Sequence, residues 1–408
     1  MRIEVVWLAS QNVTIPPITW SEQVWQPQAG RYTDTTMIPD YGRTYRALVP
    51  PRIADLQVRV PTVLAQELDD AEAALRNFDT QHGIDIAHFA ALLLRSEALS
   101  SSQIEQVDAG ARQVLAAEIG ESSRTNALLI TSASRAMQTA LSDNAPVDAA
   151  LAQRIHLALL HDYPRAHPGE YRTEPIWVGG QEATSPLTAE FVAPPENLVP
   201  ELMDDWGAYA ARRDIPPLIQ AMIAHAQFET IHPFNDGNGR TGRALLQAML
   251  QRRHVATRAV VPISSGLLAD TNKYFDALSA YRNQDAAPIL SAAVEATHRS
   301  IANARQLVAE VQTIQARHVE AAQARRGSRT AQLISFAAKQ PVFTPRLASE
   351  QLGVRPSNLQ RDLDRLVAAG ILRKSASEHR GGGKVYRADD YLAALDRFTA
   401  RARRSPAR

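Results

Sequence analysis

One segment of the chain, HPFNDGNGRTGR at residues 232–243, constrains its local fold and chemistry most strongly. Its three glycines predict a loop in which backbone N–H groups can approach a ligand closely. The apolar spacing of residues 241–251 predicts a helix directly after this loop, and the positive end of that helix would face the same ligand. Such an arrangement is suited to an anion, above all to a phosphate.

The charged side chains of this segment favour a nucleotide. Arg240 and Arg243 fall on one face of the predicted helix, so two phosphates could be bound together. Asp236 is an oxygen ligand suited to the Mg²⁺ that accompanies nucleotide phosphates. His232 is the side chain of the segment that can accept a proton near neutral pH. The chain has no GxxxxGK[ST] sequence, so the phosphate site is not of the Walker type.

The segment resembles the signature HPFx(D/E)GNGRxxR of the Fic family, whose members mostly transfer AMP from ATP to a protein hydroxyl. Every fixed position matches. The similarity extends to residues 92–106, 167–180 and 191–206, and so covers roughly residues 40–300. The resemblance implies a mainly α-helical fold, a Fic-type helical bundle with a β-hairpin flap, with ATP as substrate and Mg²⁺ as metal ion.

The resemblance also implies a role for each residue of the segment. His232 would be the general base that takes the proton of a Ser, Thr or Tyr hydroxyl, and Asp236 would hold Mg²⁺. Phe234 would anchor the loop. The nucleotide would be bound by Gly237, Asn238, Gly239, Arg240 and Arg243. Phosphoryl transfers are catalysed mainly by positioning and charge neutralisation, which these residue types can supply.

Two other interpretations of the segment are open from the sequence alone. The glycines and Phe234 could form only a helix–loop–helix turn. Alternatively, His225, Glu229 and His232 have the spacing of one helical face, as the ligands of a zinc or di-metal site do. No further ligand pair with suitable spacing accompanies them.

A second motif lies upstream, within SSQIEQ at residues 101–106. It resembles the Fic inhibitory motif (S/T)xxxE(G/N), here Ser101 and Glu105, on a helix expected at about residues 96–110. The resemblance implies that Glu105 pairs with Arg243, so that ATP binds with its α-phosphate misaligned. Gln106 departs from the motif at its last position. Ser102 and Glu105 also fit a capping box, which would need no regulatory role.

Residues 174–191 predict a β-hairpin, because two β-prone runs flank the glycine pair at residues 179–180. The segment resembles the Fic flap, which binds the backbone of the target protein as an added strand. The edge strand would be formed by Ile176, Trp177 and Val178. The Trp177 side chain could instead simply pack on the helical core.

The 408 residues, 45% hydrophobic and 21% charged, have the composition of an ordinary folded protein. No run approaches the roughly eighteen apolar residues of a membrane span, and the first residues do not resemble a signal peptide. We therefore expect no membrane association and a cytoplasmic location. The chain has no cysteine, which excludes disulfides, cysteine nucleophiles and cysteine-bound metals.

The net charge of +1 conceals an asymmetry along the chain. Residues 321–408 carry 18 Lys+Arg against 7 Asp+Glu, a net charge of +11. The order helix, helix, helix, hairpin within this stretch resembles a winged helix-turn-helix domain, with Ser357 as the N-cap of its recognition helix. DNA contacts would come from Asn358, Gln360, Arg361, Arg380 and Lys384. Such domains also bind proteins, and a merely solvated basic surface is the third interpretation.

The expected organisation has five parts. An N-terminal region (1–85) precedes the Fic core (86–300), a linker helix (301–325), the winged-helix domain (326–400) and a basic tail (401–408). The helix predicted at residues 288–324 is suited to a spacer or to a homodimer contact.

The expected activity is transfer of AMP from ATP to a hydroxyl side chain of a target protein, or of the chain itself, under inhibition by Glu105. Two alternatives are open. The same site could remove AMP, with Glu105 positioning a water molecule. The chain could also be a DNA-binding regulator whose Fic domain senses a nucleotide, in which case DNA binding would survive the loss of His232.

Overall fold

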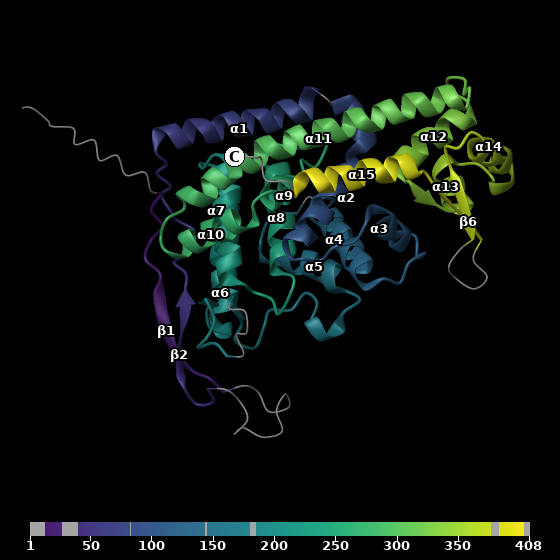
Figure 1. Cartoon of the computed structure of the whole chain (residues 1–408). Helices are drawn as coiled ribbons and strands as arrows, with labels where there is room; N and C mark the ends of the chain where they lie inside the picture. The colour runs from purple at the N-terminus through teal and green to yellow at the C-terminus, as the bar shows by residue number, and fades with distance from the viewer. Residues whose placement is uncertain are drawn as a thin grey trace, which may run out of the picture. The chain divides into compact units, whose positions relative to one another are not determined.

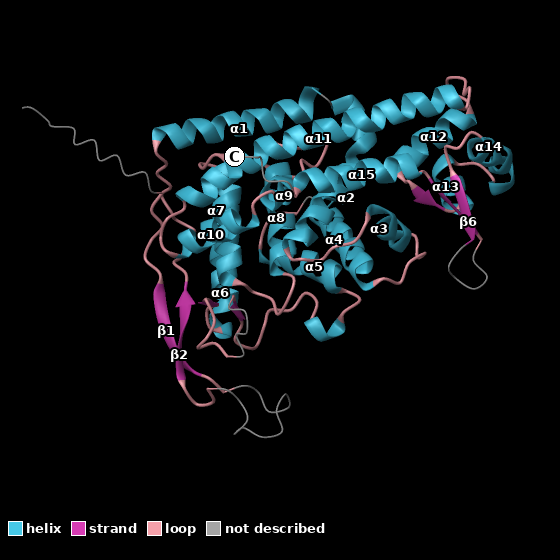
Figure 2. Ribbon diagram, in the orientation of Figure 1, coloured by secondary structure: helices cyan, strands magenta, loops and turns pink. Residues whose placement is uncertain are grey.

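The computed structural model describes residues 13–26, 40–81, 83–142, 145–179, 185–376 and 383–403. These residues are mainly helical, with a few short strands (Figures 1 and 2), which confirms the predicted fold class. The chain folds into two compact units, each of which draws on several stretches of sequence. Unit 1 consists of Met1–Glu72, Thr139–Arg253 and Asn272–Val294, and unit 2 of Ala73–Gln138, His254–Thr271 and Glu295–Arg408.

Two helices form the centre of unit 1, α7 (Pro217–Ile231) and α8 (Asn238–Arg252). Every residue of α7 from Leu218 to Ile231 is buried, so this helix must be covered on all sides. The cover comes from α8 and α6 (Val199–Ala210), while α5 (Ala149–Leu160) packs against α6 and α8. The predicted helix at residues 241–251 is confirmed as α8, although it begins earlier, at Asn238. Most of α10 (Thr271–Arg282) also belongs to unit 1.

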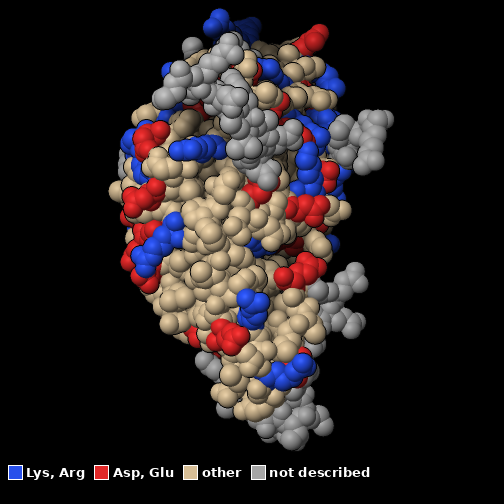
Figure 3. Space-filling model, turned by 90° about the vertical axis from the view of Figure 1, so that its left-hand side faces the viewer, with Lys and Arg blue, Asp and Glu red and all other residues tan. Residues whose placement is uncertain are grey.

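Two small antiparallel sheets complete unit 1. β1 (Thr19–Val24) pairs with β2 (Thr44–Val49), and β3 (Trp177–Val178) pairs with β4 (Phe191–Val192). A hydrophobic cluster joins the two sheets through Trp25, Tyr45, Ala47 and Val192. On the face drawn in Figure 3, where β1 and β2 lie, acidic and basic side chains are interspersed among many uncharged residues. No field of a single sign therefore covers what the figure shows of this face.

The central helix of unit 2 is α2 (Gly83–Ile104), which contacts α9 (Ile263–Leu268), α12 (Arg329–Lys339) and α15 (Asp389–Ala402). α3 (Ala111–Glu118) and α4 (Thr125–Ser142) follow it along the chain. The boundaries of about 96–110 predicted for the helix with the second motif are wrong, because α2 begins at Gly83 and ends at Ile104. α1 (Thr62–Gln81) and α11 (Ala287–Ala321) contribute to both units, and so does α4, which belongs to unit 1 from Thr139 onward. α11 lies close to the helix predicted at 288–324.

The C-terminal part of unit 2 has the order α12, β5 (Val342–Phe343), α13 (Pro345–Leu352), α14 (Pro356–Ala368), β6 (Arg373–Ala376), β7 (Lys384–Arg387). The strands form one sheet in the order β5-β7-β6. The three helices and the hairpin occur in the predicted order, with β5 as an additional short strand. Ser357 is not the N-cap of α14, because Pro356 occupies the first helical position, where its fixed φ is favourable, and Arg355 is the N-cap.

Within the described ranges, no helix combines the length and the apolar character needed to cross a membrane.

Candidate nucleotide-binding site

The segment 232–243 forms the connection between α7 and α8 in unit 1. His232 follows the last residue of α7 in a left-handed conformation, with φ 50° and ψ 61°. Its backbone N–H donates to the carbonyl of Phe228 at 2.9 Å, which closes the last turn of the helix. A left-handed backbone costs a residue other than glycine roughly 1–2 kcal/mol. The surrounding loop must therefore hold His232 in this conformation.

Phe234 fixes the middle of the loop. Its ring is fully buried and stacks on the His156 ring, with centroids 3.8 Å apart. The side chain of Asn238 closes the loop on the other side, because its Oδ1 accepts from the Phe234 N–H at 2.9 Å and its Nδ2 donates to the Phe234 carbonyl at 2.8 Å. The carboxamide of Asn238, a residue expected to bind the nucleotide, is thus bonded to the loop backbone.

Two glycines of the segment are required by their protein neighbours. Gly237 has φ +74°, and a Cβ there would lie 2.9 Å from Cδ2 of Leu159 on α5. A Cβ at Gly242 would lie 2.8 Å from Oε1 of Glu229 and 3.0 Å from Cδ1 of Phe228, both on α7. These glycines therefore let the loop pack closely on α5 and let α8 pack closely on α7. The glycines are thus needed for packing as well as for the close approach of a ligand.

His156 of α5 positions the loop, a role that the sequence did not reveal. Its Nδ1 accepts a hydrogen bond from the Gly169 N–H at 2.9 Å, which assigns the ring proton to Nε2. Nε2 lies 3.0 Å from the carbonyl oxygen of Asp236 and so donates to it. Burial lowers the pKa of His156 from 6.5 to about 4, so the ring is neutral at physiological pH. An isolated histidine on an apolar helix gave no signal of this role.

The low pKa of His156 predicts an acid sensitivity of the fold. The unfolded chain binds the proton with a pKa near 6.5 and the folded chain only near 4, so the free energy of unfolding should fall as pH drops through this window. The contribution is up to roughly 3 kcal/mol. Urea unfolding between about pH 7 and pH 4 would compare wild type with His156→Gln, which keeps a donor and an acceptor without titrating. We expect the stability advantage of the wild type to shrink as pH falls, whereas a constant difference would contradict the assignment.

Arg172 is a second positioning residue that the sequence did not reveal. Its buried guanidinium donates to the carbonyls of His232 at 2.8 Å, Glu174 at 3.3 Å and Pro194 at 2.5 Å. Its backbone N–H donates to the Pro233 carbonyl at 2.9 Å. Burial lowers the pKa of Arg172 to about 10, so it is still charged at neutral pH. Arg172 thus joins the two ends of the flap region to the loop that carries His232.

Arg240 provides the strongest electrostatic evidence for a ligand. Its side chain is only 6% exposed, and its Nη2 lies 3.5 Å from Oδ1 of Asp236, whose side chain is 65% exposed. Within the described part of the chain, the buried Nε and Nη1 of Arg240 have no hydrogen-bond partner. Leaving charged donors buried without partners costs several kcal/mol, on the order of the penalties seen for unpaired buried ions. An anion bound at the start of α8 would satisfy them. Arg243 is buried on the same helix, 1% exposed.

The site fits a magnesium ion that arrives with phosphates. Mg²⁺ is usually held by one or two carboxylates together with substrate phosphates and water. Asp236 offers one accessible carboxylate beside the open donors of Arg240, and its Oδ1 is oriented by the Gly237 N–H at 2.6 Å. One carboxylate is suited to a Mg²⁺ ion whose other ligands are phosphate oxygens and water, and not to an ion bound by protein ligands alone.

The alternative of a zinc or di-metal site is wrong. No group of three or more His, Asp or Glu residues that could hold a metal occurs among the described residues. Nε2 of His225 is instead 2.7 Å from the Tyr274 hydroxyl, inside the core of unit 1. His232 follows the end of α7 with a left-handed backbone, so it does not continue the helical face of His225 and Glu229.

The second motif forms the C-terminal end of α2 in unit 2. The Val107 N–H donates to the Ser102 carbonyl and the Gln106 N–H to the Gln103 carbonyl, both at 3.0 Å, which is a Schellman motif. Gln106 has φ +60°, which explains why the resembling motif has glycine or asparagine there. The capping-box alternative is wrong, since Ser102 lies in the last turn of α2. Ser101 is buried and Glu105 is exposed.

The predicted flap is an antiparallel pair, β3 with β4, and residues 180–184 lie outside the described residues. Trp177 packs edge-on against Trp25 with centroids 5.1 Å apart, so it belongs to the cluster between the sheets and not to the helical core. The carbonyl of Ile176 accepts from the Ala193 N–H at 3.0 Å. Val178 is 40% exposed. Among the described residues, β3 pairs with no strand besides β4.

The residues suggested for DNA contact differ in accessibility. Asn358 and Arg361 are exposed on α14, and Lys384 is exposed at the start of β7. Gln360 is half-buried, and its Nε2 donates to Oδ1 of Asp364 at 2.7 Å. Arg380 lies outside the described residues.

The loop therefore combines a buried arginine with open donors, an accessible carboxylate, a histidine and the start of a helix, which together define a site suited to nucleotide phosphates. Residues 146–250, which contain this loop, match the model of the Fic/DOC family. The chain thus carries a Fic/DOC domain.

Curated relatives agree with this family. The chain is 29% identical over 130 residues to protein adenylyltransferase Fic of Nematostella vectensis and 33% identical over 100 residues to protein adenylyltransferase fic-1 of Caenorhabditis elegans. The alignments cover 31% and 24% of this chain, and 29% and 18% of those relatives. The chain thus spans less than a third of the length of these curated relatives.

Among solved structures, a Fic family protein from Desulfovibrio desulfuricans superposes with a TM-score of 0.45 at 20% sequence identity, over 77% of this chain and 95% of that one. A fragment of Fic-1 from Caenorhabditis elegans superposes with a TM-score of 0.43 at 19% identity, over 59% of this chain and 71% of the fragment.

Proposed function

We propose that this protein is an adenylyltransferase that moves AMP from ATP to a hydroxyl side chain of a target protein, including its own chain. Arg240 is the observation that carries the proposal. Its buried guanidinium has two N–H-bearing nitrogens without partners among the described residues, at the start of a helix and beside the accessible carboxylate of Asp236. A triphosphate with its metal ion satisfies both groups at once. The Fic/DOC match and the adenylyltransferase relatives support the same reaction.

In this proposal, the oxygen of the target hydroxyl forms a bond to the α-phosphorus, and the bond from that phosphorus to the bridging oxygen breaks. Pyrophosphate leaves, and His232 accepts the hydroxyl proton. Arg240 holds the leaving phosphates, and backbone N–H groups at Gly237, Asn238 and Gly239 line the anion hole. Asp236 would hold Mg²⁺, which neutralises phosphate charge when bound.

Two other elements complete the proposed enzyme. Arg243 binds the γ-phosphate, and Glu105, with Ser101 in the same motif, inhibits the enzyme by neutralising Arg243. The strand formed by Ile176, Trp177 and Val178 receives the backbone of the target along its open edge. Because Trp177 packs on Trp25, its contribution is to hold the strand, while Val178 faces the target.

The test uses purified full-length protein with α-labelled ATP and Mg²⁺, with and without a cell lysate as a source of targets. Wild type would be compared with Glu105→Gly and with Glu105→Gly combined with His232→Ala. We expect strong protein labelling with Glu105→Gly, and little with wild type or with Glu105→Gly combined with His232→Ala. No label in any form would refute AMP transfer. Release of AMP from a labelled protein by wild type, lost in Glu105→Gly, would favour AMP removal at the same site.

We further propose that the C-terminal part of unit 2 is a winged helix-turn-helix domain that binds DNA. Its element order supports this, and so do four cationic side chains that lack a partner among the described residues: Arg355, Arg361, Lys374 and Lys384. Fluorescence anisotropy with duplex DNA should show salt-dependent binding that Arg361→Ala with Lys384→Ala weakens and His232→Ala leaves intact. Binding that is indifferent to salt and to the double substitution would exclude this role and favour a protein partner.

A further inference from the structure

The segment that follows Glu105 is held by the last helix of the chain. Oδ2 of Asp108 lies 2.6 Å from Nη2 of Arg403, the residue directly after α15, and Oδ1 of Asp108 accepts from Nε2 of Gln103 at 2.9 Å. The hydrogen bond from Arg403 holds the pKa of Asp108 below its ordinary value. This ion pair joins Asp108, three residues beyond Glu105, to the residue that follows α15.

A second contact from α15 fixes the other end of the same segment. Oδ1 of Asp396 accepts from the backbone N–H of Ala111 at 3.0 Å, so a residue of α15 caps the first turn of α3. Val107, next to Asp108, and Ala109, between the two contacts, pack against the cluster of Leu99, Val114 and Ile130. Asp396 of α15 and Arg403, directly after it, therefore contact the chain six and three residues, respectively, beyond the exposed Glu105.

α15 is itself firmly attached to α11 within unit 2, where the two helices lie side by side (Figure 1). Arg397 and Arg401 both pair with Glu310 of α11, at 3.0 Å and 2.7 Å. Nδ2 of Asn303 donates to the Phe398 carbonyl at 3.2 Å. These contacts hold α15 against α11.

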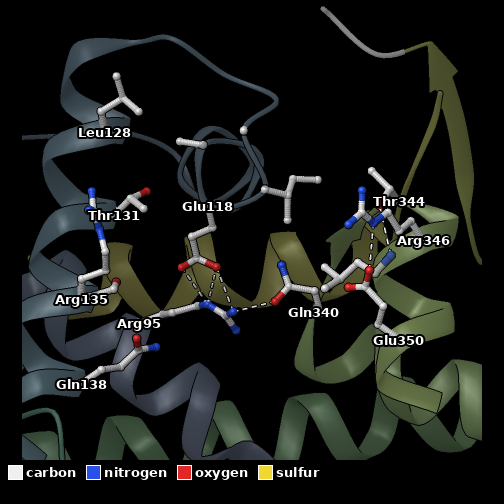
Figure 4. A pocket seen from close by; sticks show the side chains of 15 residues that line it. Arg95, Glu118, Leu128, Thr131, Arg135, Gln138, Gln340, Thr344, Arg346 and Glu350 are labelled. Atoms are coloured by element: carbon white, nitrogen blue, oxygen red, sulfur yellow. Dashed lines mark hydrogen bonds and ion pairs between the residues drawn. The ribbon is translucent and has the colours of Figure 1, made fainter. Parts of the chain in front are cut away.

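The C-terminal part also contacts the middle of α2. Nε of Arg95 donates to the carboxylate of Glu118 at 2.9 Å, and the same guanidinium donates to the Lys339 carbonyl and to Oε1 of Gln340, at the end of α12. Figure 4 shows the bonds of Arg95 to Glu118 and Gln340 in a cleft that the Arg346–Glu350 pair of α13 also lines. The volume of this cleft is about 820 Å³. α2 is thus bonded to the end of α12 through Arg95, while the segment after α2 is bonded to Asp396 of α15 and to Arg403.

We propose that Arg403 and Asp396 are positioning residues that hold Glu105 in its inhibitory place, so that the C-terminal part of the chain sets the activity of the nucleotide site. The inference rests on the proposed function, in which Glu105 inhibits AMP transfer. Loss of the Arg403–Asp108 pair frees the turn, lowers the fraction of molecules with Glu105 in place and raises transfer.

The experiment measures AMP transfer by full-length protein in five forms: wild type, Arg403→Ala, Arg397→Ala, Glu105→Gly, and Glu105→Gly with Arg403→Ala. Arg397 is the matched control, since it lies on the same helix, its ion pair does not reach the turn, and Arg401 keeps the link to Glu310 when Arg397 is removed. We expect Arg403→Ala to raise the rate on the order of fivefold, the lower end of typical couplings between linked sites. Arg397→Ala should equal wild type, and Arg403→Ala should add nothing in the Glu105→Gly background.

A charge exchange separates positioning from general loosening. Arg403→Asp combined with Asp108→Arg restores the pair in reverse and should return the rate to the wild-type level, whereas either change alone should raise it. Equal rates for Arg403→Ala and wild type, with an active Glu105→Gly form, would overturn this inference and leave the proposed function intact. An exchanged pair that stays as active as the single variants would overturn it as well. An inactive Glu105→Gly form would remove the proposed function and this inference together.

Discussion

Replacement of Arg240 by alanine in the Glu105→Gly background is expected to lower kcat/KM for AMP transfer roughly 10²–10³-fold, the usual effect of removing one donor to transition-state charge. Its guanidinium is buried, and Nε and Nη1 have no partner among the described residues, so both can be used by the leaving phosphates. Arg240→Lys should recover only part of the rate, because an ammonium group cannot replace a planar fork of donors.

The Arg240 prediction has a second readout. Because its donors are unsatisfied without a ligand, Arg240→Ala should leave the free energy of unfolding unchanged or raise it, as is common where a residue serves function at some cost to stability. Urea unfolding without nucleotide, set beside steady-state kinetics, would measure both quantities. A variant that loses stability along with activity would show that Arg240 is a structural residue instead.

Replacement of Arg172 by alanine should cost roughly 3–5 kcal/mol of unfolding free energy, because the carbonyls of His232, Glu174 and Pro194 would lose a charged donor. The loss of the His232 anchor should also reduce AMP transfer in the Glu105→Gly background. Urea unfolding would measure the first effect and labelled-ATP kinetics the second.

The matched control for Arg172 is Arg165→Ala, since Arg165 is an exposed arginine nearby in the sequence. We expect this change to alter the unfolding free energy by no more than about 0.5 kcal/mol, as is usual for surface positions. If Arg172→Ala were equally mild, the guanidinium would not be the bridge between the flap region and the loop.

The sequence predicts the loop between two helices because its information is local. The glycine spacing and the charges of Asp236 and Arg240 lie within twelve residues, and the apolar spacing of the helix at 241–251 follows directly. The order of the C-terminal elements is predictable for the same reason, since helix ends have local signals such as Gly353, the C-cap of α13. Ser357 was assigned wrongly as an N-cap because serine and proline compete for neighbouring positions and Pro356 determines the start of α14.

The positioning residues could not be predicted, because their roles depend on distant partners. His156 acts through Gly169 and Asp236, and Arg172 acts through carbonyls at His232 and Pro194. Every residue has a main-chain carbonyl, so the sequence does not show which carbonyl will accept a hydrogen bond from a distant side chain. The sequence also could not show whether Asn238 would bind the nucleotide through its side chain or its backbone. In the structure its carboxamide bonds to the backbone of Phe234.

The complete burial of α7 has a consequence for how such a protein can diversify. Because His232 follows directly on a helix without a solvent-exposed side, a single-residue insertion or deletion in α7 would turn the residues beyond it by about 100° and disrupt the core at the same time. Insertions and deletions within α7 should therefore be very poorly tolerated. Under the proposed function, changes of target preference are therefore expected at exposed positions outside this core, such as Val178.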